Sequence, residues 1–197
     1  MPGTAGNIDA KIGAEALRRG AVAILCAPPL PADLPAGVAG IAVPDPRAAL
    51  GRLARAVVER LGVTVVAVTG SSGKTTTKDM LASVLSRLGP VVAPRGSFNN
   101  EVGLPVTALR CDESTRVLVS EMGARGRGHI EYLCTITPPH ISLVLNVGSA
   151  HLGEFGSREA IGQAKSEIVR ALRPDGVAVL NVDDPIVEAM ATVTEAR

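Results

Sequence analysis

The segment from Val65 to Leu81 (VVAVTGSSGKTTTKDML) joins a run of valines to a helical pattern through two glycines and a lysine. Gly70 and Gly73 let the backbone approach a ligand closely, so that its N–H groups can bind an anion. Lys74 adds a full positive charge, and the start of the following helix adds a partial one. The Thr75 hydroxyl can hold a nucleotide-bound Mg²⁺. This order of elements predicts a phosphate-binding loop rather than an ordinary capped glycine turn.

Glu121 and His151 follow two other predicted strands, RVLVS and ISLVLN. Because parallel strands end at one edge of a sheet, both side chains are expected beside the phosphate loop. A carboxylate there can hold the Mg²⁺ of a nucleotide, and an imidazole can serve a second metal position. Taken singly, Glu121 is as readily a solvated residue at a strand end, and His151 more often a surface residue. The shared edge favours the metal sites.

Lys165 lies in the helical pattern REAIGQAKSEIVRALRP, four residues after Ile161 and three before Ile168. It therefore points with the apolar stripe, where burial disfavours the charged form of an amine. A neutral amine can react with CO₂ to give a carbamate, which is a metal ligand. In the alternative, which periodicity alone favours, the lysine lies at the edge of the stripe and its stem carries the ammonium to solvent.

Asn99 and Asn100, in SFNNEVGLP, allow two interpretations of equal weight. Either residue can cap the helix that follows, because an asparagine side chain accepts hydrogen bonds from the first amides of a helix. Either can also contact a substrate.

The elements that would place these residues alternate along the second part of the chain. Continuous Val, Ile and Leu runs predict strands that are buried on both faces of a parallel sheet. The expected fold class is α/β, an open and mostly parallel sheet with helices on both faces. The strands are predicted at 64–69, 91–93, 116–120, 141–146 and 177–181, and the helices at 75–88, after Asn100, around 128–133, at 158–172 and after Asp184.

A smaller α/β region precedes this sheet, with a boundary near Gly62. Residues 9–21 have a helical pattern, residues 21–27 form a short apolar run that predicts a strand, and residues 46–61 have a second helical pattern with Pro46 at its start.

The composition limits the class of protein. The 197 residues include 20 Lys and Arg against 19 Asp and Glu, a balance that argues against nucleic-acid binding driven by net charge. Three scattered cysteines, Cys26, Cys111 and Cys134, have no zinc spacing and are expected to be free thiols. No apolar run is long enough to span a bilayer, so we expect a soluble cytoplasmic protein without membrane insertion.

Together the motifs resemble those of the Mur ligase superfamily, and most closely its MurF type. The general phosphate-loop pattern requires glycine where this chain has Val68, and the shorter loop GSSGKT is similar to that of Mur ligases and folylpolyglutamate synthetases. The resemblance covers nearly the whole chain, including RGAVAILCA and VPDPRAALGRLA in its first part. The other matching stretches are VTGSSGKTTTKDML, NNEVGLPVTALR, EMGARGRGHIEYL, NVGSAHLGEFGSREAIGQAKSEI and LNVDDP.

The resemblance implies a role for each matching residue. Thr75 and Glu121 would hold the Mg²⁺ of ATP, and His151 with a carbamylated Lys165 would hold a second metal ion. Ser166 departs from the AKGE sequence that the family leads us to expect. The residues implied to bind ATP are Gly70, Ser71, Ser72, Gly73, Lys74, Thr75 and Thr76, those implied in catalysis are Lys74, His151 and Lys165, and those implied to contact substrate are Asn99 and Asn100.

The implied reaction is amide-bond formation in peptidoglycan precursor synthesis. ATP would phosphorylate the carboxylate of UDP-N-acetylmuramoyl-tripeptide, and the amine of D-alanyl-D-alanine would then displace phosphate. The family has three domains, and residues 1–62 and 63–197 resemble parts of the UDP-substrate-binding and ATP-binding domains. We therefore expect a monomeric fragment without the third domain, which alone turns over weakly or not at all. Alternatives are another Mur-type ligase, of the MurE or folylpolyglutamate synthetase type, and a non-catalytic ATP-binding remnant.

Overall fold

A computed structural model of the chain describes residues 13–148 and 152–197, which fall into two compact units divided between Ala49 and Leu50. The sequence placed this boundary near Gly62. The difference arises from helix α2 (Pro46–Leu61), because Ala54 and Val58 bury their side chains in the core of the second unit. The assignment of the two parts to UDP-substrate and ATP binding stays a prediction.

The first unit is the smaller of the two. Residues 13–18 are helical, and strands β1 (Ala23–Cys26) and β2 (Ala39–Ala42) pair in parallel, with Ala23 opposite Ala39. None of residues 13–49 is fully buried. The predicted helix and strand are therefore present in the described part of this unit, but these residues enclose no core of their own.

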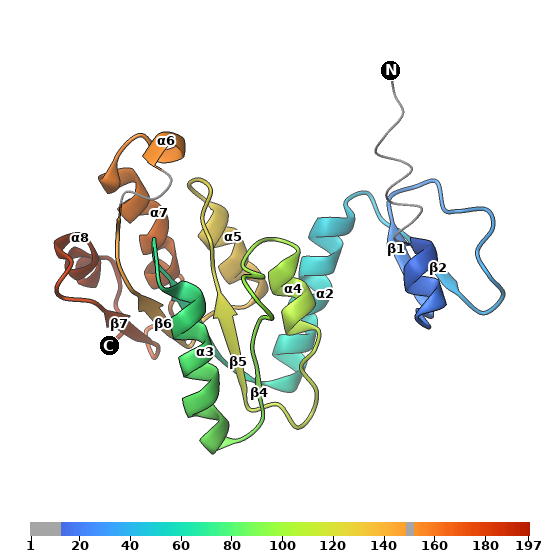
Figure 1. Cartoon of the computed structure of the whole chain (residues 1–197), viewed down its shortest axis with the longest axis horizontal. Coiled ribbons are helices and arrows are strands. Elements are labelled where there is room, and N and C mark those ends of the chain that lie inside the picture. The colour runs from blue at the N-terminus through green and yellow to red at the C-terminus, as the bar shows by residue number, and fades with distance from the viewer. Residues whose placement is uncertain (1–12, 149–151) are drawn as a thin grey trace. The chain divides into compact units, whose positions relative to one another are not determined.

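The second unit is built on a parallel sheet of five strands (Figure 1). The order β4-β5-β3-β6-β7 places the strand that precedes the phosphate loop, β3, in the centre. The predicted open parallel α/β sheet is confirmed. The strands are β3 (Thr64–Thr69), β4 (Val91–Val92), β5 (Val117–Glu121), β6 (Ile141–Val144) and β7 (Val177–Leu180).

Helices pack on both faces of this sheet (Figure 1). Helix α3 (Lys74–Leu85), extended by the 3₁₀ turn η1 (Ser86–Leu88), covers β5, β3 and β4 on one face. The other face carries α2, α4 (Gly103–Ala108), α5 (His129–Ile136) and α7 (Arg158–Arg170). The remaining elements are α6 (Leu152–Phe155), which the sequence did not predict, α8 (Pro185–Glu188) and η2 (Ala189–Val193).

Burial differs between the central and the edge strands of the sheet. Every residue of β5 is buried, and so is every residue of β3 after Thr64, as the continuous apolar runs predicted. For the edge strands β4 and β7 the prediction of burial on both faces is wrong, because no residue of either strand is fully buried and Val179 is 47% exposed. An apolar run therefore does not by itself distinguish a central strand from an edge strand.

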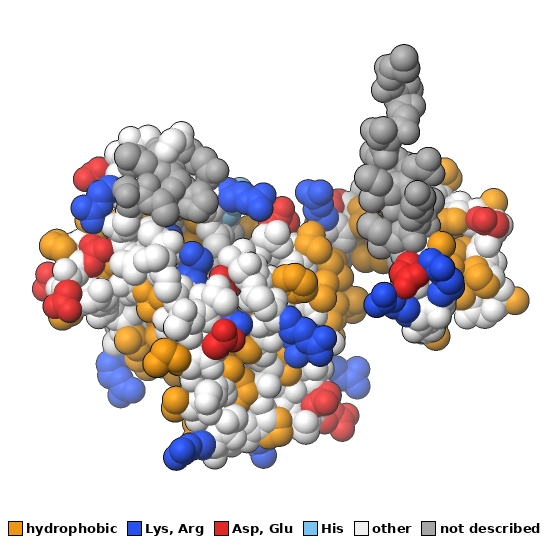
Figure 2. Space-filling model, in the orientation of Figure 1, with side chains coloured by type: hydrophobic (Ala, Val, Ile, Leu, Met, Phe, Trp, Pro, Cys, Tyr) orange, Lys and Arg blue, Asp and Glu red, His pale blue; other side chains and the backbone are white. Residues whose placement is uncertain are grey.

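The surface agrees with the charge balance of the sequence. Basic and acidic side chains are interspersed over the face that Figure 2 shows, with hydrophobic side chains between them. Among the helices of the described residues, none is long and apolar enough to cross a membrane.

Candidate nucleotide and metal site

Hydrogen bonds hold three strand ends together at the carboxyl edge of the sheet. The Thr69 hydroxyl, at the end of β3, donates to the Met122 carbonyl beyond β5 over 2.8 Å. The Leu145 amide, beyond β6, donates to the Thr69 carbonyl over 3.0 Å. Whatever follows β3, β5 and β6 is therefore placed on one rigid edge.

The phosphate loop leaves this edge through two glycines with different roles. A Cβ on Gly70 would lie 2.9 Å from the Cβ of Leu145, so only glycine fits this close approach. Gly73 has φ 80°, a left-handed conformation that glycine adopts without strain. As the residue before α3 it offers no side-chain cap, so the first amides of the helix keep no intrahelical partner and are available to an anion.

Asn146, beyond β6, binds the same loop from the side. Its Oδ1 accepts hydrogen bonds from the amides of Ser71 and Ser72, each over 3.1 Å, and its Nδ2 donates to the Ser72 carbonyl. No local sequence pattern indicates this role, because the partners lie about 75 positions apart. Asn146 fixes the shape of the loop before any ligand is bound.

Lys74 folds back over the loop. Its Nζ donates to the Gly70 carbonyl over 2.7 Å. Burial lowers the pKa of Lys74, and the negative charge of Glu121 partly offsets this effect. The ammonium is thus held where the outer phosphates of a nucleotide would meet it. Of the other predicted loop residues, Thr75 is half-buried and Thr76 is exposed.

Glu121 is fully buried at the end of β5. Its Oε1 accepts a hydrogen bond from Asn99 Nδ2 over 2.8 Å. Its other oxygen, Oε2, is buried and has no hydrogen-bond partner in the described part of the chain. A buried carboxylate oxygen without a partner is costly, and a cation beside it would remove that cost. The interpretation as a solvated strand end is therefore wrong.

The donor set suits Mg²⁺ better than a metal caged by protein. Within residues 13–148 and 152–197 no group of three or more His, Cys, Asp or Glu side chains is arranged to hold a metal ion. Mg²⁺ is usually bound through one or two carboxylates together with phosphates and water. The unpartnered oxygen of Glu121, beside a phosphate-type loop, fits that pattern.

The two asparagines make different contacts. Asn100 Oδ1 accepts from the amides of Val102 and Gly103, over 3.2 and 2.8 Å, at the start of α4. Asn99 instead binds Glu121, and its carbonyl accepts from the Gly123 amide over 2.9 Å. The capping interpretation is confirmed for Asn100. Asn99 bridges the ends of two segments at the site.

Lys165 is buried in α7, with 5% of its surface exposed. The alternative in which its stem carries the ammonium to solvent is therefore wrong. Burial, and to a smaller extent the nearby charge of Lys74, lower the pKa of Lys165 to about 8. The amine therefore loses its proton near pH 8, well below the ordinary range of a lysine. His151, the other predicted metal residue, lies outside the described residues.

Lys74, Lys165, Gly70, Asn99 and Asn100 line one cavity of about 390 Å³. Arg125, His129 and Tyr132, which the sequence did not single out, line it too. His129 Nδ1 accepts from the Arg125 amide over 3.2 Å, so the neutral imidazole carries its proton on Nε2. The glycine-rich loop after Glu121 was the one signal for this group.

Glu167 links helices α5 and α7, which border this cavity. From α7, two residues beyond Lys165, it accepts hydrogen bonds from the amides of Gly128 over 2.7 Å and Glu131 over 3.0 Å. A carboxylate suits this position because it complements the partial positive charge at the start of α5. Sequence reasoning missed Glu167, since its partners lie in another helix.

Residues 68–197 match the family model of the Mur ligase middle domain. A UDP-N-acetylmuramoyl-tripeptide–D-alanyl-D-alanine ligase of Mycobacterium leprae is 50% identical over 210 residues, covering 93% of this chain and 40% of that protein. The crystal structure of MurF from Acinetobacter baumannii has 41% identity and a TM-score of 0.81, and the match covers 94% of this chain and 40% of that one.

MurF from Thermotoga maritima, solved in complex with ADP, has 37% identity and a TM-score of 0.80, with 94% of this chain and 43% of that chain covered. The chain thus spans about 40% of the length of these curated relatives.

Proposed function

This chain belongs to the Mur ligase family, and we propose that it supplies the ATP-binding and Mg²⁺-binding part of a ligase that joins D-alanyl-D-alanine to UDP-N-acetylmuramoyl-tripeptide. The observation that carries the proposal is the convergence of Lys74 and Lys165 on one cavity, next to the unpartnered carboxylate oxygen of Glu121. The relatives named for this reaction, at 40–50% identity, support the choice of substrates.

In the proposed reaction the γ-phosphoryl group of ATP passes to the carboxylate of the tripeptide. ADP leaves, and an acyl phosphate remains. The amine of D-alanyl-D-alanine then attacks the acyl carbon, and phosphate departs with the bonding pair of the C–O bond. Lys74 acts on the transferred phosphoryl group, because a fixed cation stabilises the negative charge that spreads over its oxygens.

Mg²⁺ would supply further charge neutralisation when bound, and the chain offers Thr75 and Glu121 to hold it. A second metal ion would use His151 and Lys165. The lowered pKa of Lys165 supports its carbamylation, in which the neutral amine adds to CO₂ and releases one proton. Arg125 and His129, on the same cavity wall, are the groups that we assign to the peptide substrate. Asn99 and Asn100 would contact it with the polar atoms that are not used in binding Glu121 and in capping α4. We place this reaction in the cytoplasm and propose a monomer.

The first test measures ATP binding by the 197-residue chain, by titration calorimetry with and without Mg²⁺. We expect Mg²⁺-dependent binding that Lys74→Met abolishes and that Glu121→Gln makes independent of Mg²⁺. Binding that is equal in all three proteins, or absent from the unaltered chain, would overturn the proposal. ADP release with both substrates then shows whether the chain also ligates.

The nearest alternative is a relative that adds a single amino acid, as in the MurE type. Offering D-alanyl-D-alanine and single amino acids to the same ligase distinguishes the two, because only one class of amine gives product. ATP binding without any ligation would instead favour a non-catalytic remnant.

A further inference from the structure

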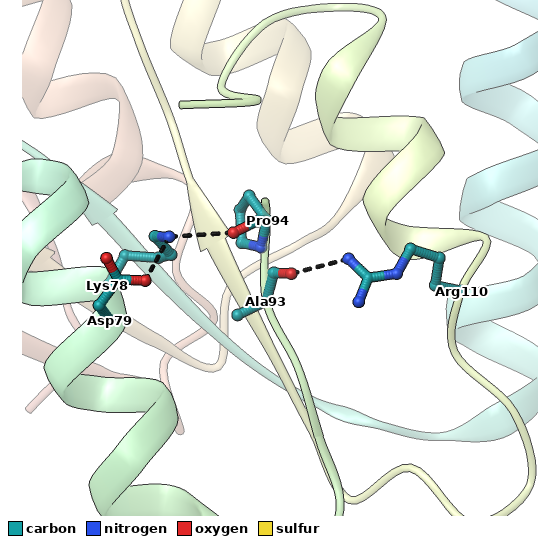
Figure 3. A network of polar contacts seen from close by, with 5 residues as sticks. All are labelled: Lys78, Asp79, Ala93, Pro94 and Arg110. Atoms are coloured by element: carbon teal, nitrogen blue, oxygen red, sulfur yellow. Dashed lines mark hydrogen bonds and ion pairs between the residues drawn. The ribbon is translucent and has the colours of Figure 1, made fainter. Parts of the chain in front are cut away.

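A second buried lysine, Lys78, lies in the phosphate-loop helix α3 and has no role assigned above. Lys78 is four residues beyond Lys74 in α3, and only 2% of its surface is exposed. Figure 3 shows its Nζ between two acceptors, Asp79 Oδ1 at 2.5 Å and the Pro94 carbonyl at 2.9 Å. A buried ammonium is costly unless it is paired, so this position calls for an explanation.

The Pro94 carbonyl lies in a segment that follows strand β4 and has no strand pairing. Strand β4 ends at Val92, and the next two carbonyls are bound by side chains instead (Figure 3). Arg110 Nη1 donates to the Ala93 carbonyl over 2.9 Å, and Lys78 binds that of Pro94. Two cations thus replace the ladder partner that this edge of the sheet lacks.

The segment that begins at Pro94 leads directly to the metal side of the site. Five residues later Asn99 donates to Glu121 Oε1 and accepts from the Gly123 amide. The path from the phosphate-loop helix to the buried carboxylate is therefore continuous, through Lys78, the Pro94 carbonyl and Asn99.

We propose that Lys78 is a positioning residue, which anchors segment 94–98 to the phosphate-loop helix and so holds Asn99 against Glu121. In this arrangement Oε1 of Glu121 is occupied by Asn99 and Oε2 is left for the metal. Loss of the anchor frees the segment, and the carboxylate is no longer held in one orientation. The inference rests on the proposed function, because it assigns Mg²⁺ to Glu121.

The test compares Lys78→Met with the unaltered chain in two titrations. We expect the Mg²⁺ concentration that gives half-maximal ATP binding to rise about tenfold, as for other residues that orient a metal ligand. ADP binding in EDTA, which needs the loop but no metal, stays within about twofold of the unaltered chain. Lys78→Arg keeps a donor at this position and restores part of the Mg²⁺ response. Arg87→Met, which removes an exposed charge near the far end of α3, is the matched control and changes neither titration.

A double-mutant cycle with Asn99→Ala tests the path itself. If Lys78 acts through Asn99, the double variant shows the same Mg²⁺ requirement as Asn99→Ala alone, since the second change has nothing left to disturb. Additive effects, or an unchanged requirement in Lys78→Met, would overturn the inference. Should Lys78→Met fail to fold, Lys78→Arg in the same cycle decides the matter. Failure of the unaltered chain to bind ATP with Mg²⁺ would instead count against the proposed function.

Discussion

The two faces of the central sheet bury lysine in different ways. On the α3 face the buried apolar cluster has three of the described residues, Val66, Val117 and Val119, and Lys78 lies between a carboxylate and a carbonyl. On the face of α5 and α7 the cluster is much larger, and the charged neighbour of Lys165 is another lysine, Lys74. The first arrangement anchors a chain segment, and the second destabilises the ammonium form.

The neighbours of each lysine distinguish a structural lysine, Lys78, from a reactive one, Lys165. An ammonium with two acceptors is a fixed link between elements, as in the path from α3 to Pro94. An amine that is enclosed by apolar helices and faces a cation is driven towards its neutral, nucleophilic form.

The largest expected effect is a stabilisation by Lys165→Met. At pH 7 the folded wild-type chain carries a buried charge, because the pKa of Lys165 is about 8 rather than the ordinary 10.5. Removing it raises the free energy of unfolding by up to about 3 kcal/mol, at roughly 1.4 kcal/mol for each unit of pKa shift. Between pH 8 and 10.5 the folded wild-type state sheds its proton before the unfolded state does, so wild-type stability rises and the gap closes.

The measurement is urea denaturation across that pH range, in CO₂-free buffer with EDTA. Lys78→Met is the matched change on the other face, and it is expected to destabilise by about 1–3 kcal/mol because it leaves the buried Pro94 carbonyl without its donor. If both lysine-to-methionine variants changed the free energy of unfolding in the same direction, the distinction between the two faces would be contradicted.

The second prediction compares the same truncation in the two clusters. Val65 and Val119 are both fully buried, Val65 in the large cluster and Val119 in the small one. Val65→Ala is expected to cost about 2–3 kcal/mol and Val119→Ala about 1–2 kcal/mol, since a site in a large core collapses less around the cavity. Thermal denaturation of both variants gives the comparison. Equal losses would show that the α3 face is packed as tightly as the other.

The third prediction concerns the link between α5 and α7. Glu167→Gln replaces one accepting oxygen with a donor that faces an amide, so one of the two bonds to Gly128 and Glu131 is lost. We expect a loss of about 1–2 kcal/mol, the range for a hydrogen bond to a charged group. Hydrogen exchange should speed up at residues 128–131. The control is Glu113→Gln, which changes an exposed carboxylate in a loop. Exchange that is equally slow at residues 128–131 in both variants would contradict the proposed link between α5 and α7.

The sequence predicted the sheet, the loop and most helices because these follow from local patterns. What it missed depends on partners far along the chain. Asn146 reaches Ser71, and Glu167 reaches Gly128, across separations that no periodicity records. For Lys165, periodicity alone favoured the alternative in which the ammonium reaches solvent, and this was wrong because only the packing of the surrounding elements decides whether a residue at the stripe is covered. The open face of β7 was misjudged for the same reason.

The smallest effect is expected at the cysteines, which are free thiols as predicted. Burial raises the pKa of Cys111 to about 11 and that of Cys134 to about 12, and both lie in the large cluster. The thiolate is the reactive form, so at pH 8 iodoacetamide should modify the half-buried Cys26 first, Cys111 slowly and Cys134 only on unfolding. Peptide mass mapping over time gives the order. Early labelling of Cys134 would mean that the α5 and α7 face opens readily, and the enclosure that lowers the pKa of Lys165 would then be lost with it.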